Sequence, residues 1–187
     1  MYSVYFVTGV YGVGKTTLCN KLRRVTGLPA FSAGDLISEI NGETYGKNKV
    51  VKDVKYNQDI LLLAVETKLQ VCPEMILAGH FCIVSKNNTV ELLPDHIFDK
   101  IHLRQIILLE ADVLQVAKNI KSRDQQTYPI QTLEQLIACE RMQAQRVSQK
   151  LMIPLTIYNM HYDHSDEYLL AESLLQSREN VHTSGYE

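Results

Sequence analysis

Near the N-terminus, small and hydroxyl-bearing residues surround one lysine in a spacing that suits phosphate binding. The stretch from Gly9 to Thr16 reads GVYGVGKT and matches the pattern G-x-x-x-x-G-K-[ST] at every fixed position. Glycines permit backbone conformations that turn several N–H groups inward onto phosphate oxygens. Lys15 can then span the β- and γ-phosphates, and the Thr16 hydroxyl can hold Mg²⁺. We therefore expect a nucleoside triphosphate, ATP, to bind with Mg²⁺ to these residues: Gly9, Tyr11, Gly12, Val13, Gly14, Lys15, Thr16 and Thr17.

Four further side chains could act in phosphoryl transfer, each with a structural alternative. Arg123 and Arg141 can stabilise charge on the transferring group alongside Lys15, although an exposed salt bridge is the alternative for Arg141. Asp35 can orient or deprotonate an acceptor hydroxyl, or can cap the helix that follows it. His80 follows a predicted central strand, so it can contact the acceptor or make a structural hydrogen bond.

Two other groups of residues invite a metal-binding interpretation. His161-Tyr162-Asp163-His164 combines imidazole and carboxylate ligands, but its position after the last predicted strand favours a solvated or adenine-facing loop. Glu110 ends a strongly apolar stretch and can serve either as a metal-associated carboxylate or as an ordinary solvated strand end.

The elements that position these residues alternate between strand and helix. We expect strands at 3–8, 29–33, 74–78, 104–110 and 154–158, and helices at 15–25, 35–40, 55–71, near 94, 112–122, 132–151 and 166–177. A small hairpin is expected at 84–93 with Asn87-Asn88 at its turn, and a mobile polar connection at 41–53. The alternation predicts a three-layer α/β/α fold around a mostly five-stranded parallel sheet.

Length and composition limit the organisation of the chain. Its 187 residues suit one domain, which we place at 1–177 with a lid at about 118–131 and a flexible tail at 178–187. A net charge of -2 gives no global attraction to nucleic acid, and no apolar stretch is long enough to span a membrane. The four cysteines are scattered without a C-x-x-C pair, and no signal peptide is expected. Reduced thiols in a cytoplasmic protein follow from this pattern.

Four stretches resemble the nucleoside monophosphate kinase superfamily. They are the phosphate loop followed by Thr17, FSAGDLI at 31–37, ILLEAD at 107–112 with the helix toward Arg123, and the long helix with Glu140-Arg141 and Arg146 before Ile153-Pro154. The most similar pattern is that of archaeal-type adenylate kinase and related ATP-binding kinases, in which a strand is followed by Asp, a small residue and His. Here Ala78-Gly79-His80 stands in that place.

The resemblance implies a P-loop kinase fold and transfer of the γ-phosphate of ATP to a nucleotide acceptor near Asp35. Two positions depart from the pattern. Ala78 replaces the strand-end Asp that helps to organise Mg²⁺, and Ser38 and Glu39 stand where an arginine usually binds the acceptor phosphate. Two alternatives therefore remain open: a kinase of a sugar, metabolite or polynucleotide end, and a slow ATPase that acts as a switch with a protein or RNA partner.

Overall fold

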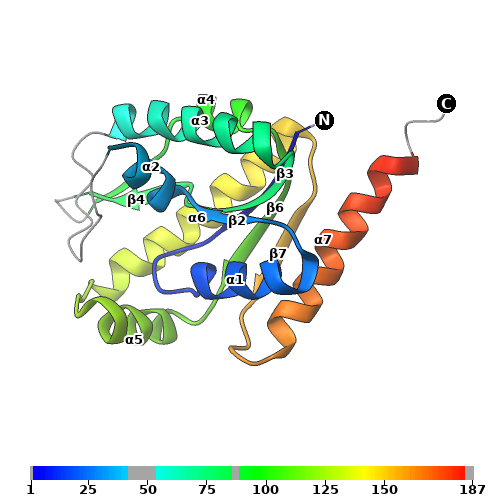
Figure 1. Cartoon of the computed structure of the whole chain (residues 1–187). Coiled ribbons are helices and arrows are strands. Elements are labelled where there is room, and N and C mark those ends of the chain that lie inside the picture. Colours follow the sequence, from blue (N-terminus) through cyan, green and yellow to red (C-terminus); the bar gives the residue numbers. More distant parts are fainter. Residues whose placement is uncertain (1, 42–53, 86–88, 184–187) are drawn as a thin grey trace.

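A computed structural model describes residues 2–41, 54–85 and 89–183 of the chain (Figure 1). Most of the polar connection expected at 41–53, and the expected hairpin turn at Asn87-Asn88, lie outside these ranges. None of the helices within the described ranges has the length and apolar character needed to cross a membrane.

The centre of the molecule is a five-stranded parallel sheet with the strand order β2-β3-β1-β6-β7. A separate antiparallel pair, β4 and β5, forms the expected hairpin. The strands are β1 (Ser3–Thr8), β2 (Ala30–Ser32), β3 (Glu74–Ala78), β4 (Cys82–Val84), β5 (Val90–Leu92), β6 (Leu103–Glu110) and β7 (Leu155–Asn159). The predicted parallel sheet is confirmed in its number of strands and in their positions.

The helices alternate with these strands as predicted. They are α1 (Lys15–Thr26), α2 (Ala33–Asn41), α3 (Val54–Val71), α4 (Asp95–Lys100), α5 (Val113–Asp124), α6 (Ile130–Leu151) and α7 (Ser165–Thr183). Asp112 caps α5 as expected, because its carboxylate accepts hydrogen bonds from the backbone N–H groups of Leu114 at 2.9 Å and Gln115 at 3.2 Å.

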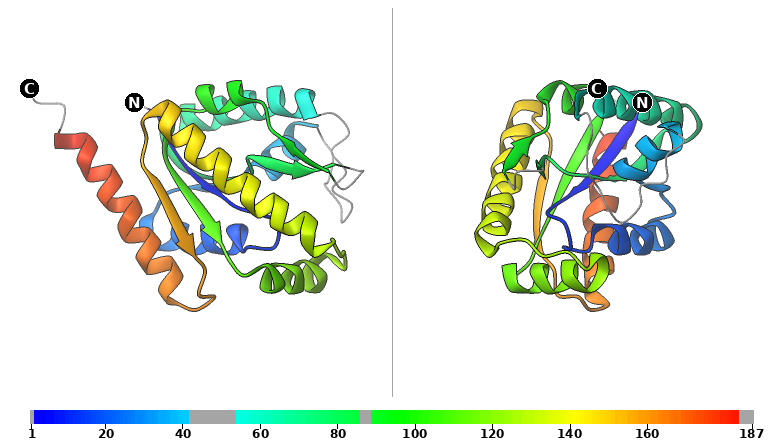
Figure 2. Two further views of the ribbon diagram at one scale, coloured as in Figure 1. Left: turned by 180° about the vertical axis from the view of Figure 1, so that it is seen from behind. Right: turned by 90° about the vertical axis from the view of Figure 1, so that its left-hand side faces the viewer.

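Helices cover both faces of the sheet (Figure 2). α1 and α7 pack against each other on one face, and α6 crosses the other face. β1 lies at the centre and all six of its residues are buried, which explains its unbroken run of apolar and β-branched residues. The result is the predicted three-layer arrangement, with one apolar core running through both sides of the sheet.

The parallel direction of the strands brings their carboxyl ends to one edge of the sheet. Loops that follow β1, β3, β6 and β7 therefore meet at this edge, which lies toward the phosphate loop in Figure 1. Ligands of open parallel sheets bind outside this edge, where the chain connections diverge. The residues proposed above for chemistry lie at strand ends, in the loops that follow the strands, or on the helices between them.

The expected tail and the expected lid both contain parts of helices. The tail expected from residue 178 starts inside α7, which continues to Thr183. Arg178 donates a hydrogen bond of 2.6 Å to the Glu74 carboxylate at the start of β3. The region expected as a lid, 118–131, contains the end of α5, the linking residues 125–129 and the start of α6. Gln125 ends α5 in the left-handed conformation.

Candidate functional site

The phosphate loop joins β1 to α1 and depends on glycine at two crowded positions. Gly9 has a φ of 140°, and a Cβ there would lie 2.5 Å from the carbonyl oxygen of Leu109. Gly12 has a φ of 77°, and a Cβ there would lie 2.7 Å from Cγ1 of Ile120. Both residues therefore need the left-handed conformation and the missing side chain. The loop packs closely against β6 and α5, and this packing restricts its backbone conformation.

The N-terminus of α1 offers unsatisfied backbone donors at the end of this loop. Its N-cap is Gly14, which has no side chain to accept from the first-turn N–H groups, and no acidic residue lies in the first turn. The side chains of Thr16 and Thr17 are exposed there. Because the helix dipole places partial positive charge at this end, the site favours an anion.

Lys15 lies over the loop that precedes it. Its ammonium group donates to the carbonyl oxygens of Gly9 at 2.8 Å and Val10 at 3.0 Å. The positive charge is therefore held beside the backbone that would surround the phosphates.

A cavity of about 320 Å³ opens beside the phosphate loop. Two side chains on its wall bind the loop directly: Asn119 Nδ2 donates to the Gly12 carbonyl at 2.9 Å, and the Tyr162 hydroxyl donates to the Val13 carbonyl at 3.4 Å. Its lining comes from the phosphate loop, α1, α5, the connection from β7 to α7 and the start of α7: Gly12, Gly14, Thr17, Leu18, Lys21, Asn119, Ser122, Arg123, Met160, Tyr162, Asp163 and Asp166. A cavity of this size next to the phosphate loop can hold the nucleoside part of ATP.

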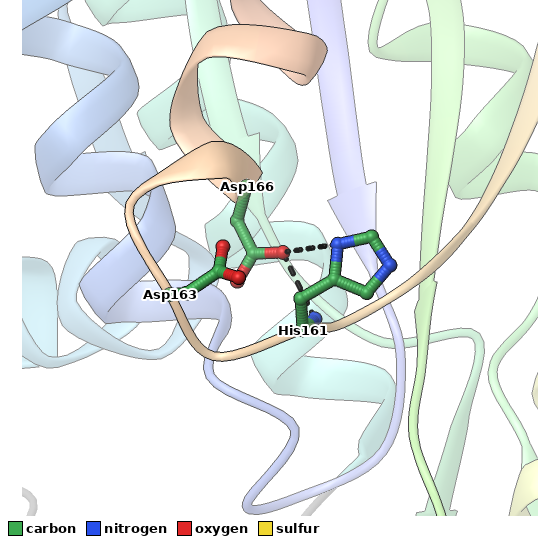
Figure 3. A group of neighbouring side chains, drawn as sticks. All are labelled: His161, Asp163 and Asp166. Atoms are coloured by element: carbon green, nitrogen blue, oxygen red, sulfur yellow. Dashed lines mark hydrogen bonds and ion pairs between the residues drawn. The ribbon is translucent and has the colours of Figure 1, made fainter.

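Tyr162 and Asp163, in the segment from His161 to His164, line this cavity. Figure 3 shows His161, Asp163 and Asp166 close together where this segment leads into α7. Ligand atoms of His161, Asp163 and Asp166 lie within 4.8 Å of one another. Both carboxylates already shape the loop, because Asp166 accepts from the backbone N–H groups of His161 at 2.9 Å and Tyr162 at 2.8 Å, and Asp163 accepts from Ser165 N at 2.8 Å. The hydrogen bonds from Ser165 also hold the pKa of Asp163 below its usual value. These hydrogen bonds make the segment a structured part of the cavity wall.

His80 and Tyr11 lie together on another side of the phosphate loop. Their ring centroids are 4.5 Å apart, and the Tyr11 ring also stacks on Tyr128 at 6.5 Å, in the connection between α5 and α6. Neither Tyr11 nor His80 lines the cavity. Burial raises the pKa of Tyr11 well above its usual value. Tyr11 thus packs against two other parts of the chain, at His80 and at Tyr128, instead of projecting freely toward a base.

Glu140 is a functional candidate that the sequence analysis did not single out. This carboxylate is only 1% exposed, yet it accepts hydrogen bonds from Thr8 Oγ1 at 2.7 Å and from the backbone N–H groups of Phe81 at 2.9 Å and Cys82 at 3.0 Å. Its Oε1 also lies 3.6 Å from Nδ1 of His80. Glu140 therefore ties the end of β1, the segment after β3 and α6 together.

A signal for Glu140 was present in the sequence. It falls in the apolar stripe of α6, between Leu136 and Ala144, where spacings of four residues place all three side chains on the buried face. A carboxylate in such a stripe needs polar partners, because burying an unpaired charge is costly.

The two arginines proposed for catalysis are both paired with carboxylates. Arg141 Nε donates to Glu110 Oε1 at 2.7 Å, and its terminal nitrogen binds the second oxygen, so the pair is bidentate. Glu110 is therefore engaged by a guanidinium, which argues against its role as a metal-associated carboxylate. Arg123 lines the cavity beside the phosphate loop while its Nε donates to Asp124 at 2.8 Å. Of the two, only Arg123 lies at the cavity.

Asp35 occupies a different position from the one that a simple helix cap requires. α2 begins at Ala33, and the Asp35 backbone N–H donates to Ser32 Oγ at 3.5 Å, so Ser32 stands at the N-cap and Asp35 in the first turn. Its side chain is exposed. Ser32 pairs with Ala78 at the carboxyl ends of β2 and β3, which places the start of α2 at the same edge of the sheet as the phosphate loop.

Comparison with known proteins gives a family and a fold. The model of a family described as an AAA domain matches residues 8–137. No curated protein matches the chain. Among solved structures, a gluconokinase from Sinorhizobium meliloti 1021 superposes with a TM-score of 0.58 at 14% identity, covering 99% of this chain and 98% of that one.

Two other solved structures are similar over their whole length. The shikimate kinase from Acinetobacter baumannii in complex with shikimate gives a TM-score of 0.57 at 13% identity, covering 100% of this chain and 96% of that one. The shikimate kinase from Aquifex aeolicus gives 0.58 at 12%, covering 98% and 99%. The five-stranded parallel sheet, the glycine loop and these matches establish the P-loop α/β/α fold, and the chain belongs to the AAA domain family whose model it matches.

Proposed function

We propose that this protein is an ATP-dependent kinase that transfers the γ-phosphate of ATP to a small hydroxyl-bearing molecule. One observation carries the proposal: the glycine loop and the uncapped start of α1 open directly into the cavity of about 320 Å³. The loop suits the phosphates, and the cavity between Asn119 and Tyr162 suits the nucleoside. The membership of the family and the fold of the kinases compared above support this assignment.

In this proposal, catalysis depends on positioning and on positive charge. Lys15 would leave the carbonyl oxygens of Gly9 and Val10 to bind the β- and γ-phosphates, and Arg123 would lie at the cavity wall. Mg²⁺, when bound, neutralises charge on the phosphates, and the exposed Thr16 hydroxyl at the start of α1 fits its usual ligand position. Ala78 contributes no carboxylate at the end of β3, so phosphate oxygens and water would complete the metal's coordination.

The acceptor would lie on the Tyr11 and His80 side of the loop. His80 follows the carboxyl end of β3, and its ring is held between Tyr11 and the buried Glu140 carboxylate. An imidazole in this position can accept a hydrogen bond from an acceptor hydroxyl and help to remove its proton. Asp35, exposed at the start of α2, is a second candidate for contact with the acceptor.

Two observations favour a hydroxylated metabolite without a phosphate group over a nucleoside monophosphate. Ser38 and Glu39 occupy the α2 positions where the nucleotide kinases have an arginine. Arg141 is bound by Glu110, so its charge is already balanced. The similar solved structures include a gluconokinase and a shikimate kinase, which also supports a hydroxylated metabolite as the acceptor. A nucleotide acceptor remains the alternative within the same reaction class.

A slow ATPase that acts through a partner is the second candidate function. The observation in its favour is Ala78, an apolar and buried residue at a strand end where many relatives carry the acid that organises Mg²⁺. Such a protein would hydrolyse ATP at a rate that no small acceptor increases.

The experiment that tests the proposal measures ADP formation from Mg-ATP with and without candidate acceptors. The panel contains sugars, sugar acids, other polyhydroxylated acids, nucleosides and nucleoside monophosphates. Stimulation by a hydroxylated metabolite supports the proposal, whereas stimulation only by nucleoside monophosphates would restore the nucleotide acceptor. ADP formation that no compound increases would favour the ATPase.

A further inference from the structure

Two cysteines from distant parts of the chain lie in direct contact. Cys82 begins β4 and is fully buried, while Cys139 is partly buried on α6. The Cys82 thiol points at the sulfur of Cys139, and the two Sγ atoms are 2.8 Å apart. Both are free thiols, as are Cys19 and Cys72. A disulfide bond brings two sulfur atoms to about 2.0 Å, so a short movement of these side chains would join them.

The backbone on both sides of the pair is already held in place. Cys139 directly precedes Glu140, whose Oε1 accepts from the N–H groups of Phe81 at 2.9 Å and Cys82 at 3.0 Å. These hydrogen bonds fix β4 against α6 next to the two sulfur atoms. The contact therefore does not depend on the chance position of a flexible loop.

We propose that Cys82 and Cys139 are a modification site that peroxide-class oxidants convert reversibly into a disulfide bond. Cys139 is the first sulfur to react, because it is partly exposed and accepts the hydrogen bond from the Cys82 thiol. Cys82 is the resolving thiol, since it is buried directly beside Cys139. Burial, with the Cys139 contact and the Glu140 charge, also raises the pKa of Cys82 well above its usual range.

The chemistry balances in two steps. The Cys139 thiolate attacks one oxygen of hydrogen peroxide, so that an S–O bond forms, the O–O bond breaks, and the departing hydroxide takes up a proton to become water. The Cys82 sulfur then attacks the sulfenic acid, so that an S–S bond forms, the S–O bond breaks, and the Cys82 proton leaves with the second hydroxide as water. Two thiols lose two electrons, and one peroxide is reduced to two waters.

The site lies next to the proposed acceptor residues. Cys82 is two residues after His80, so the disulfide would bind the segment that carries His80 covalently to α6. The bond would still form if the protein had another activity, because the proposal depends only on the positions of the two thiols.

The test is peptide mapping of the reduced protein after treatment with a small molar excess of hydrogen peroxide, with Cys72→Ser as the decisive variant. In the wild type, cleavage after lysine and arginine leaves Cys72 and Cys82 together in peptide 69–86, and Cys139 in peptide 124–141. A cross-link from this peptide in the wild type could therefore start at either cysteine. Cys72→Ser leaves Cys82 as the one cysteine in peptide 69–86, and it replaces a cysteine outside the proposed pair. We expect this variant to yield peptides 69–86 and 124–141 joined by a bond that dithiothreitol breaks, with a total mass lower by two hydrogen atoms.

The matched variant Cys139→Ser should yield no joined peptide under the same treatment. Retention of all thiols in Cys72→Ser would overturn the proposal, as would oxygen added to Cys139 without a cross-link. If Cys139→Ser does not fold, the Cys72→Ser map decides alone. Thermal unfolding gives a second measurement, since oxidation should raise the midpoint of Cys72→Ser, and an unchanged midpoint would show that the bond had not formed within the native structure.

Discussion

Thr8 at the end of β1 donates a hydrogen bond of 2.7 Å to Glu140, a residue 132 positions later in the chain. Thr8 directly precedes the phosphate loop, and Glu140 also binds the segment after β3. One buried carboxylate therefore connects the residue before the phosphate loop to the segment that carries His80. This connection holds the two sides of the proposed site at a fixed separation.

Replacement of Glu140 by glutamine should destabilise the protein by about 2–4 kcal/mol, because an amide can satisfy fewer of the buried donors around it. Thr8→Val removes one donor with little change of shape, and should cost about 1 kcal/mol. Urea unfolding measures both free energies. Glu134→Gln, an exposed change on the same helix, is the control and should stay within about 0.5 kcal/mol of the wild type. Equal stability of Glu140→Gln and Glu134→Gln would contradict this account.

Replacement of Gly12 by alanine should weaken ATP binding at least about 10-fold, because the new Cβ would press against Ile120 and displace the phosphate loop from α5. Gly27→Ala is the matched control. Its φ of 73° is strained to a similar degree, but no atom lies within 4 Å of the added Cβ. Titration of both variants with a fluorescent ATP analogue separates loop displacement from general strain. Similar loss of affinity in both would refute the role assigned to Gly12.

Replacement of His80 by glutamine should raise the KM for the acceptor about 10-fold and change the KM for ATP little, because His80 does not line the cavity proposed for the nucleoside. The kinetics are measured with whichever acceptor the panel identifies. His96→Gln, an exposed histidine on α4, should leave both constants unchanged. A rise in the KM for ATP alone would place His80 with the nucleotide instead.

Alkaline pH should unfold the protein partly through Tyr5. Burial, together with the hydrogen bond of its hydroxyl to Glu74, raises the pKa of Tyr5 to about 12. The folded state therefore holds the Tyr5 proton more tightly than the unfolded state, whose pKa is near 10. This contribution is complete below pH 10 and is lost as the pH rises toward 12. Tyr5→Phe should show a smaller loss of unfolding free energy than the wild type between pH 10 and 11.5, and parallel losses would contradict the assignment.

The fold and the phosphate loop could be predicted because their signals are local. β1 is buried on both faces, so every residue from Ser3 to Thr8 had to suit the core. The structure of the phosphate loop could be predicted because its glycines permit the required backbone conformation and because a strand precedes it and a helix follows it. The order of the strands in the sheet could not be predicted from local patterns, because it depends on which face of the sheet each connecting helix crosses.

The partners of charged residues were the part that the sequence did not reveal. Arg141 looked available for catalysis, but Glu110 lies 31 positions away in sequence and beside it in space. The same holds for Cys82 and Cys139, which are scattered in sequence and in contact in the fold. Such pairs depend on how α6 lies against the ends of β3 and β6, and no spacing within one element encodes that arrangement.

The central claim is tested most directly by transfer of radiolabelled γ-phosphate from ATP to the identified acceptor, with Lys15→Met compared with the wild type. The wild type should label the acceptor, and Lys15→Met should reduce the rate at least about 100-fold while its circular dichroism spectrum remains unchanged. Transfer by a folded Lys15→Met variant within about threefold of the wild-type rate would contradict the proposed mechanism.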